Sequence, residues 1–391
     1  MLARQPTVAC SLVVLTLIYC LSNIGGWVAP ELVFELIGER GLGEAGAGAV
    51  AALEMLGLAV AALGLSLAAD RLPVRRLALF GSALLVLTQL LSWRAESLAG
   101  LLTLRFFCGV GQGVLMALAN AALAAGSAPH RRLAQANLVN VLFGSALLFS
   151  LAPLRSAWPA LGLFLVLTLV CLVLAPASFA LPARLQVQSA PVRRRLGLPN
   201  MTCYGLVAAI FVFGCTSGAA FTFAHLMGEG AGLGESTINL ALSLSVLGAF
   251  PGSALCGLIN TRLRSFWPLT CALLLHSLAN LMASHASGAW SFGFGLAGNL
   301  GAAYFLLPYL QGLSARYDPY GGCCAAIGGA FFLSMAGGAY LGGALVQWHG
   351  VNALGWAVVG SNLLVGVLLL LSLGARRSVA VELAAPRYDF V

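Results

Sequence analysis

The run AGLLTLRFFCGVGQGVLMALANAA, residues 99–122, decides the fold class of this chain. It carries one charged residue, Arg105, and as a helix it is long enough to cross the ~30 Å hydrocarbon core of a bilayer. Similar runs recur along all 391 residues, of which 60% are apolar and only 8% charged. Soluble domains carry about 25% charged residues, and the strands of membrane barrels alternate polar with apolar residues. The sequence therefore excludes a soluble protein and disfavours a β-barrel.

Apolar runs separated by polar, Gly or Pro breaks predict an all-α membrane protein with twelve transmembrane helices. The longest loop follows the sixth run, carries Arg193, Arg194 and Arg195, and divides the helices into two six-helix bundles. We expect an N-terminal bundle over 1–181, a cytoplasmic linker over 182–200, a C-terminal bundle over 201–375 and a cytoplasmic tail over 376–391. The predicted spans are 8–30, 47–69, 76–93, 99–122, 134–153, 157–176, 201–226, 237–259, 266–284, 290–313, 321–345 and 350–374.

The positions of the basic residues predict the orientation. All 20 are Arg, and most of them lie in loops that twelve alternating spans place on one side. Because short Arg-bearing loops stay in the cytoplasm, we expect both termini there. The exclusive use of Arg is typical of a GC-rich genome, so we expect the inner membrane of a bacterium. The net charge of +8 is spread over the loops, whereas nucleic-acid binding requires a clustered basic patch.

A short internal repeat supports the division into two halves. Gly41-Leu42-Gly43-Glu44 stands before the second span, and Gly232-Leu233-Gly234-Glu235 stands before the eighth. At the same offset Gly57 matches Gly248 and Arg71 matches Arg262. Duplicated bundles of this kind form a central pathway in many transporters.

Glu54 and Arg105 are the acid and the base that we expect inside the bundle. Every other acid is expected in or next to a loop, and both residues lie about seven positions, roughly 10 Å, from the same membrane face. Glu54 shares a helix face of small residues with Gly57 and Gly64, so this face is predicted to pack against protein. Buried charges in membranes usually pair. Either Glu54 exchanges a proton beside Arg105, or the two bind a charged substrate, or they form a static ion pair.

Two motifs, together with the layout of two six-helix halves, resemble the major facilitator superfamily of secondary transporters. Arg105, Gly109, Gly111 and Gly113 match its Arg-x-x-x-Gly-x-Gly-x-Gly signature, and the resemblance implies a role for Arg105 in proton transfer or substrate binding. Its Asp-Arg-x-Gly-Arg-Arg loop is matched by Asp70, Arg71, Arg75 and Arg76, with one extra residue and without the Gly. The resemblance implies that these charges latch the halves at a cytoplasmic gate; alone, Arg75 and Arg76 fit an ordinary cytoplasmic loop.

Polar residues in the spans are candidates for lining a substrate cavity. In the superfamily, spans 1, 4, 7 and 10 usually line the cavity, and each candidate has an interhelical hydrogen bond as its alternative role. His225 is included because a His can relay protons, whereas His276 in span 9 is set aside as peripheral. The candidates are Asn23, Trp27, Asn120, His225, Asn299 and Tyr304.

The sequence thus predicts a proton-coupled secondary transporter that moves a small organic solute by alternating access. Its expected partners are the solute, H⁺ and the lipid bilayer, and by analogy it is a monomer. No ATP site, redox cofactor or metal site is visible, and no convergent catalytic set indicates an enzyme. Proton-driven efflux of hydrophobic drugs is the nearer alternative, although span 5 lacks the antiporter Gly-Pro signature. A membrane sensor without transport, or an intramembrane enzyme, is the more distant one.

Overall fold

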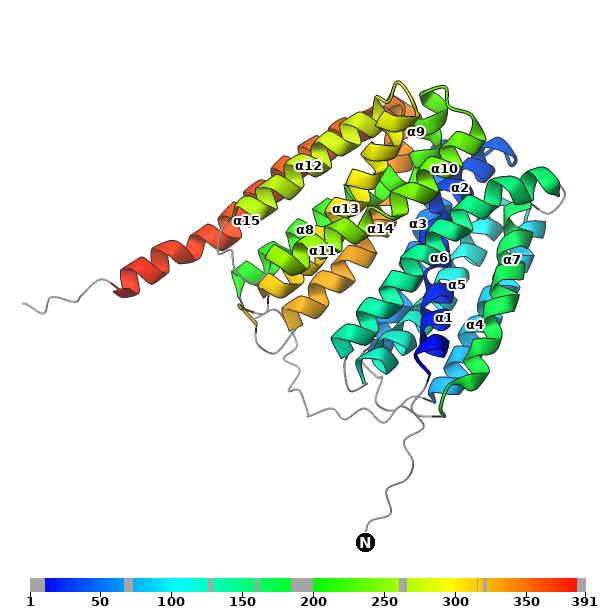
Figure 1. Cartoon of the computed structure of the whole chain (residues 1–391), viewed down its shortest axis with the longest axis horizontal. Coiled ribbons are helices and arrows are strands. Elements are labelled where there is room, and N and C mark those ends of the chain that lie inside the picture. The colour runs from blue at the N-terminus through cyan, green and yellow to red at the C-terminus, as the bar shows by residue number, and fades with distance from the viewer. Residues whose placement is uncertain are drawn as a thin grey trace, which may run out of the picture.

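The chain is described from a computed structural model that defines residues 11–66, 73–125, 129–158, 162–183, 200–259, 266–314, 316–318 and 322–384. Within these residues all regular structure is helical, as predicted, and the helices run side by side in one bundle (Figure 1). The elements are α1 Leu12–Ser22, α2 Ile24–Gly38, α3 Glu44–Ser66, α4 Val74–Arg94, α5 Leu98–Ala124, α6 Pro129–Ala157, α7 Gly162–Leu174, η3 Ala175–Ala180, α8 Met201–Thr222, α9 Ala224–Gly230, α10 Glu235–Val246, α11 Ala249–Ile259, α12 Trp267–Ser284, α13 Ala289–Ser314, α14 Gly322–His349 and α15 Ala353–Ala384.

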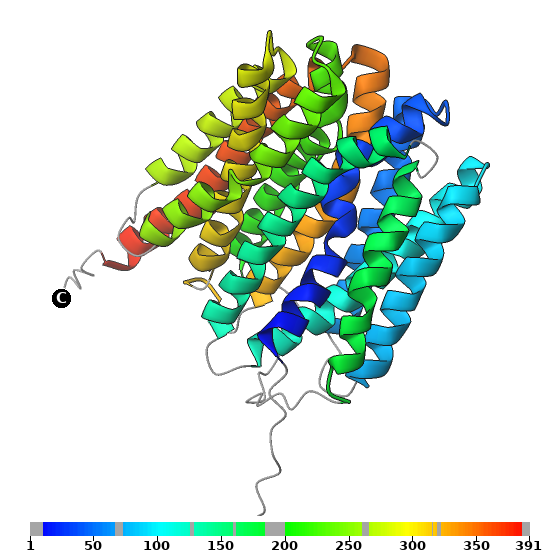
Figure 2. The same ribbon diagram turned by 45° about the vertical axis from the view of Figure 1, so that its right-hand side comes forward.

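Several passes through the bundle consist of two consecutive elements. α1 and α2 follow one another across Asn23, α8 and α9 across Phe223, α10 and α11 across Leu247 and Gly248, and η3 extends α7. Counting each of these composite passes and each single long helix as one segment, the described residues contain ten segments that are long and apolar enough to cross a membrane. α12 and α13 run alongside them (Figure 2) but are less apolar, because their polar residues include His276, Asn280 and Asn299.

The first span is longer than predicted. We expected it to end at residue 30, before Glu31 and Glu35, but α2 continues through Pro30 to Gly38. Glu31 is 0% and Glu35 is 3% exposed, so the expectation that Glu54 is the one acid inside the bundle is wrong. An acid is stable at such a depth only with partners, and both side chains have them, as described below.

The two halves contact each other most extensively through two helix pairs that the internal repeat relates. α3 of the N-terminal half packs along α14 of the C-terminal half, and α10 packs along α6. α10 is the counterpart of α3 in the other half, and α6 is the counterpart of α14, so the two pairs are equivalent. The repeated Gly-Leu-Gly-Glu segments are structurally equivalent, since Gly41 (φ 64°) and Gly232 (φ 72°) are both left-handed, just before α3 and α10.

The glycines of α3 and α5 let these helices approach closely. A Cβ on Gly109 would clash with the backbone of Glu54 and would lie 2.9 Å from the backbone N of Leu58. A Cβ on Gly57 would lie 3.0 Å from the backbone N of Val110. Small residues permit such contact, which is a main source of helix association in lipid. The prediction for this face of α3 is wrong at Gly64, where a Cβ would meet nothing within 4 Å.

The bundle has two ends, which we call the Glu39 end and the Arg75 end. α2 ends and α3 begins at the Glu39 end, and α4 begins at the Arg75 end. The distribution of Arg predicts that the Arg75 end is cytoplasmic. α15 continues to Ala384, past residue 375, where we predicted the C-terminal bundle to end.

Candidate functional site

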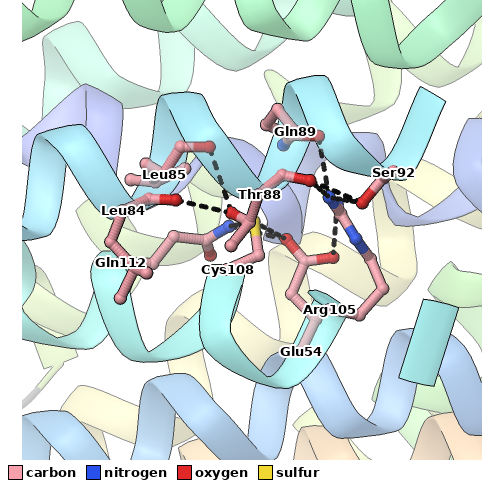
Figure 3. A network of polar contacts seen from close by, with 9 residues as sticks. All are labelled: Glu54, Leu84, Leu85, Thr88, Gln89, Ser92, Arg105, Cys108 and Gln112. Carbon is pink, nitrogen blue, oxygen red and sulfur yellow. Dashed lines mark hydrogen bonds and ion pairs between the residues drawn. The ribbon is translucent and has the colours of Figure 1, made fainter. Parts of the chain in front are cut away.

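Glu54 and Arg105 meet inside the N-terminal half. Each side chain is 1% exposed, and Arg105 Nη1 lies 3.4 Å from Glu54 Oε2 (Figure 3). Glu54 lies one helical turn before Gly57 on α3, and Arg105 one turn before Gly109 on α5. The close glycine contacts between these two helices therefore hold the charges at the same depth. The predicted juxtaposition is present, and a buried pair of this kind is compensated by further hydrogen bonds.

α4 supplies the remaining partners of Arg105. Its Nη2 donates to Ser92 Oγ at 2.8 Å, to Gln89 Oε1 at 3.0 Å and to the carbonyl of Thr88 at 3.4 Å (Figure 3). The guanidinium also lies 5.1 Å from the ring centre of Phe164, within the range of a cation–π contact. Arg105 is thus fixed by groups that stay within its own half.

The second carboxylate oxygen of Glu54 faces the neighbouring turn of α5. Gln112 Nε2 donates to Glu54 Oε1 at 2.6 Å, and Cys108 Sγ lies 3.6 Å from the same atom (Figure 3). Gly25 of α2 lies directly over this contact, because a Cβ there would be 2.6 Å from Gln112 Nε2. Gln112, Gln89 and Ser92 were not among the predicted site residues. Only Gln112 could have been predicted from the sequence, because it lies seven residues after Arg105 and therefore on the same side of α5.

Glu54 also borders a small cavity between the two halves. The cavity has a volume of about 40 Å³ and is lined from α2 and α3 on one side and from α8 and α14 on the other. A water molecule needs at least 10–15 Å³ on the same measure, so the space has room for a few waters. Glu54 is the one charged side chain among its lining residues, which are Gly25, Gly26, Ala29, Leu32, Ala51, Glu54, Met55, Gly218, Phe221, Thr222 and Met335.

A second charged cluster, which was not predicted from the sequence, lies at the Glu39 end. Arg155 of α6 is 3.3 Å from Glu31, 3.5 Å from Glu35 and 3.1 Å from Glu39. Glu35 Oε2 also accepts from the backbone N–H of Leu163 at 2.8 Å. The spacing of four residues between the three acids places them on one helix face, which was the available signal. Because we predicted that the first span ends at residue 30, these three acids were expected in a loop.

His225 belongs to this cluster and does not line the central cavity. Its Nδ1 lies 2.7 Å from Glu31 Oε1, where the ring N–H donates to the carboxylate, and its ring stacks on Phe34 with 3.9 Å between centres. His225 is buried in α9, whereas Glu31 and Phe34 belong to α2. The contact therefore joins the two halves.

Asn299 lies at the centre of a polar cluster in the C-terminal half. Its Oδ1 accepts from His276 Nε2 at 2.8 Å, from Ser217 Oγ at 3.1 Å and from Asn280 Nδ2 at 3.2 Å. The side-chain amide of Asn362 lies against the other ring nitrogen, with Nδ2 3.0 Å from His276 Nδ1, so both ring nitrogens of His276 have hydrogen-bond partners. His276, which we set aside as peripheral, is buried and contacts Asn299 directly. The arrangement is that of an interhelical network, the alternative role named for each candidate.

The other predicted residues are dispersed. Asn23 donates to the carbonyl of Tyr19 at 2.8 Å at the break between α1 and α2. Trp27 Nε1 donates to Asn140 Oδ1 at 3.2 Å within the N-terminal half. Asn120 is half-buried on α5, and Tyr304 is half-buried against the main apolar core. None of these four is among the residues that line the cavity beside Glu54.

The predicted cytoplasmic gate is only partly described. Asp70 and Arg71 lie outside the described residues. Arg75 and Arg76 are exposed in the first turn of α4, at the end opposite Glu39. Among the residues that the structure defines, no group of three His, Cys, Asp or Glu side chains is placed to hold a metal ion.

Known proteins provide an independent comparison. Residues 12–319 match the family model described as Major Facilitator Superfamily. The solved structure of the nucleoside transporter NupG is similar with a TM-score of 0.70 at 13% identity, covering 93% of this chain and 97% of that chain. The human organic anion transporter MFSD10 (TETRAN) gives 0.61 at 17% identity, covering 93% and 100%. A bacterial homolog of the human lysosomal transporter Spinster, inward-facing and unoccupied, gives 0.63 at 14% identity, covering 92% and 94%. No curated protein sequence matches the chain.

Proposed function

The chain belongs to the Major Facilitator Superfamily, and on that premise we propose that it carries a small organic solute by alternating access, driven by protons that bind Glu54. It is a multi-pass membrane transporter. The observation that carries the proposal is the position of Glu54, which borders the cavity between the halves with one face and contacts Arg105 with the other.

The size of the cavity supports alternating access. About 40 Å³ is too small for an organic solute, while pockets for small molecules measure ~300–1,000 Å³. The lining comes from both halves, so rotation of the halves enlarges the cavity and opens it to one side of the membrane. The described conformation then corresponds to a state without solute at this position.

The contacts of Arg105 support Glu54 as the proton-binding group. When Glu54 takes up a proton it loses its charge, and Arg105 retains its hydrogen bonds to Ser92, Gln89 and Thr88. The guanidinium therefore stays compensated in both protonation states of Glu54. A proton reaches Glu54 from the cavity, because Arg105 lies on the far side of the carboxylate and is not among the lining residues.

The remaining parts of the proposal follow from the sequence. The Arg-rich loops favour cytoplasmic termini and a bacterial inner membrane, and the symmetry of the two halves favours a monomer with one pathway. A thermal-shift screen identifies the solute, because binding raises the apparent stability of the purified protein. Nucleosides and organic anions belong in the screen, because two of the structural neighbours are named as their transporters.

The test replaces Glu54 by Gln, which keeps the size of the side chain and removes its titration. In proteoliposomes with an internal pH dye, wild type should acidify or alkalinise the lumen when a solute from the screen is added, and E54Q should not. E96Q, which removes an exposed acid from the loop between α4 and α5, is the matched control and should behave as wild type.

Two outcomes contradict the proposal. If E54Q couples proton movement to solute flux as wild type does, Glu54 is not the coupling group. If the exchanged pair E54R/R105E restores coupled flux as well as folding, the two residues have only the structural role of a static ion pair.

A further inference from the structure

A buried contact between the halves remains outside the proposed mechanism. Glu31 of α2 and His225 of α9 lie 2.7 Å apart and are both 0% exposed. They belong to different halves, near the Glu39 end of the bundle. Phe34 covers the His225 ring in a nearly parallel stack of 16°. The pair is therefore held in a fixed geometry and out of water, where a hydrogen bond to a charged group is strong.

Glu31 has a second partner, and this one lies in its own half. Arg155 Nη1 contacts Glu31 Oε2 at 3.3 Å, from α6. When the halves separate at this end, Glu31 keeps the guanidinium while His225 loses the carboxylate. A buried acid without a partner is costly, so Arg155 lowers the free energy of the separated state.

The pair lies next to open space at the same end. A hollow of about 660 Å³ is lined by Phe34, Glu39 and Arg155 from the N-terminal half and by Glu235 and Ser236 from the C-terminal half. Two of these residues contact the pair, since Phe34 stacks on His225 and Arg155 binds Glu31. Separation of Glu31 from His225 thus extends an existing hollow toward the cavity beside Glu54.

We propose that Glu31 and His225 form the latch that closes the Glu39 end during alternating access, and that Arg155 stabilises Glu31 when the latch opens. The inference rests on the proposed function, because a latch needs two alternating states. It assigns His225, Glu31 and Arg155 to the control of the conformational equilibrium, separate from the coupling role of Glu54.

The latch predicts effects of opposite sign for neighbouring substitutions. H225F keeps the stack on Phe34 and removes the hydrogen bond, so the Glu39 end should open about ten-fold more often. E31Q removes the charge but keeps an acceptor for His225, so the same shift should be smaller. R155Q leaves Glu31 with His225 as its main partner, so this end should open less often than in wild type. General destabilisation would instead shift all three variants in one direction.

Hydrogen exchange in lipid nanodiscs measures this opening without a solute. Amide exchange in Ile24–Gly38 and Ala224–Gly230 should rise about ten-fold in H225F, rise less in E31Q and fall in R155Q, since local exchange reports the population of the open state. Exchange in Leu98–Ala124 should stay unchanged as the folding control. H285F, at an exposed His after α12 at the same end, should match wild type.

Three results overturn the latch. The first is exchange in H225F and E31Q within two-fold of wild type and H285F. The second is faster exchange in R155Q. The third is loss of folding in both H225F and E31Q, because a latch between halves is not required for the halves to fold. The proposed coupling fails separately, through unchanged proton-linked flux in E54Q, and that outcome leaves the exchange pattern intact.

Discussion

Replacing Gly57 by Ala tests the helix contact that positions Glu54 against Arg105. A Cβ at Gly57 would overlap the backbone oxygen of Phe106 and lie 3.0 Å from the backbone N of Val110. Backbone atoms within a helix cannot rotate away, so α3 and α5 must move apart. The ion pair one turn away already has 3.4 Å between its atoms, which leaves little tolerance before the contact is lost.

The magnitude follows from comparison with Gly64, two turns later on the same helix. A Cβ there meets nothing within 4 Å, so G64A should gain the helix preference of Ala over Gly, up to about 1 kcal/mol. G57A makes the same gain but adds overpacking, which costs ~1–3 kcal/mol. The two variants should therefore differ by about 1–3 kcal/mol in free energy of unfolding, with G57A the less stable.

Equilibrium unfolding in mixed micelles, with a denaturing detergent as the variable, measures this difference. The pH dependence of solute flux in proteoliposomes should also weaken in G57A and remain in G64A, because only the former displaces Glu54 from Arg105. Equal unfolding free energies for the two variants would refute the reasoning, since they would mean that α3 and α5 are not in contact at Gly57.

Two further predictions concern other parts of the chain. N299A should lower the free energy of unfolding by about 1–3 kcal/mol, because it removes the acceptor that His276, Ser217 and Asn280 share. N120A, at a half-buried Asn of α5, is the control and should change the free energy of unfolding by less. R75Q and R76Q should each leave the free energy of unfolding within about 0.5 kcal/mol of wild type, since both side chains are exposed. A reduced rate of solute flux in either variant would support the predicted cytoplasmic gate. Wild-type flux in both variants would argue against it.

The pairing of Glu54 with Arg105 was predictable because both residues were expected at one depth and buried charges in membranes usually pair. Both residues lie on helices that start from the same membrane face, so the rise per residue places them at one level. The glycines after Arg105 indicated a close helix contact, and the family resemblance supplied the arrangement of the spans. The cluster around Glu31 was not predicted, because the acids and Pro30 resemble the end of a span. Pro30 can stand within a membrane helix, since neighbouring groups satisfy the freed backbone.

The sequence by itself determined the membrane class, the all-helical fold and the common depth of Glu54 and Arg105, because bilayer thickness and helical rise act along one dimension. Only the tertiary structure decided which side of each helix faces which neighbour. His225 and Glu31 are far apart along the chain and belong to different halves, and they meet because α9 packs against α2. Asn299 and His276 likewise meet because α13 and α12 pack with these two side chains facing each other. In lipid, several faces of a helix carry small side chains that permit close packing, so the sequence does not show which face meets a neighbour. The orientation of each helix about its axis depends on all its contacts together.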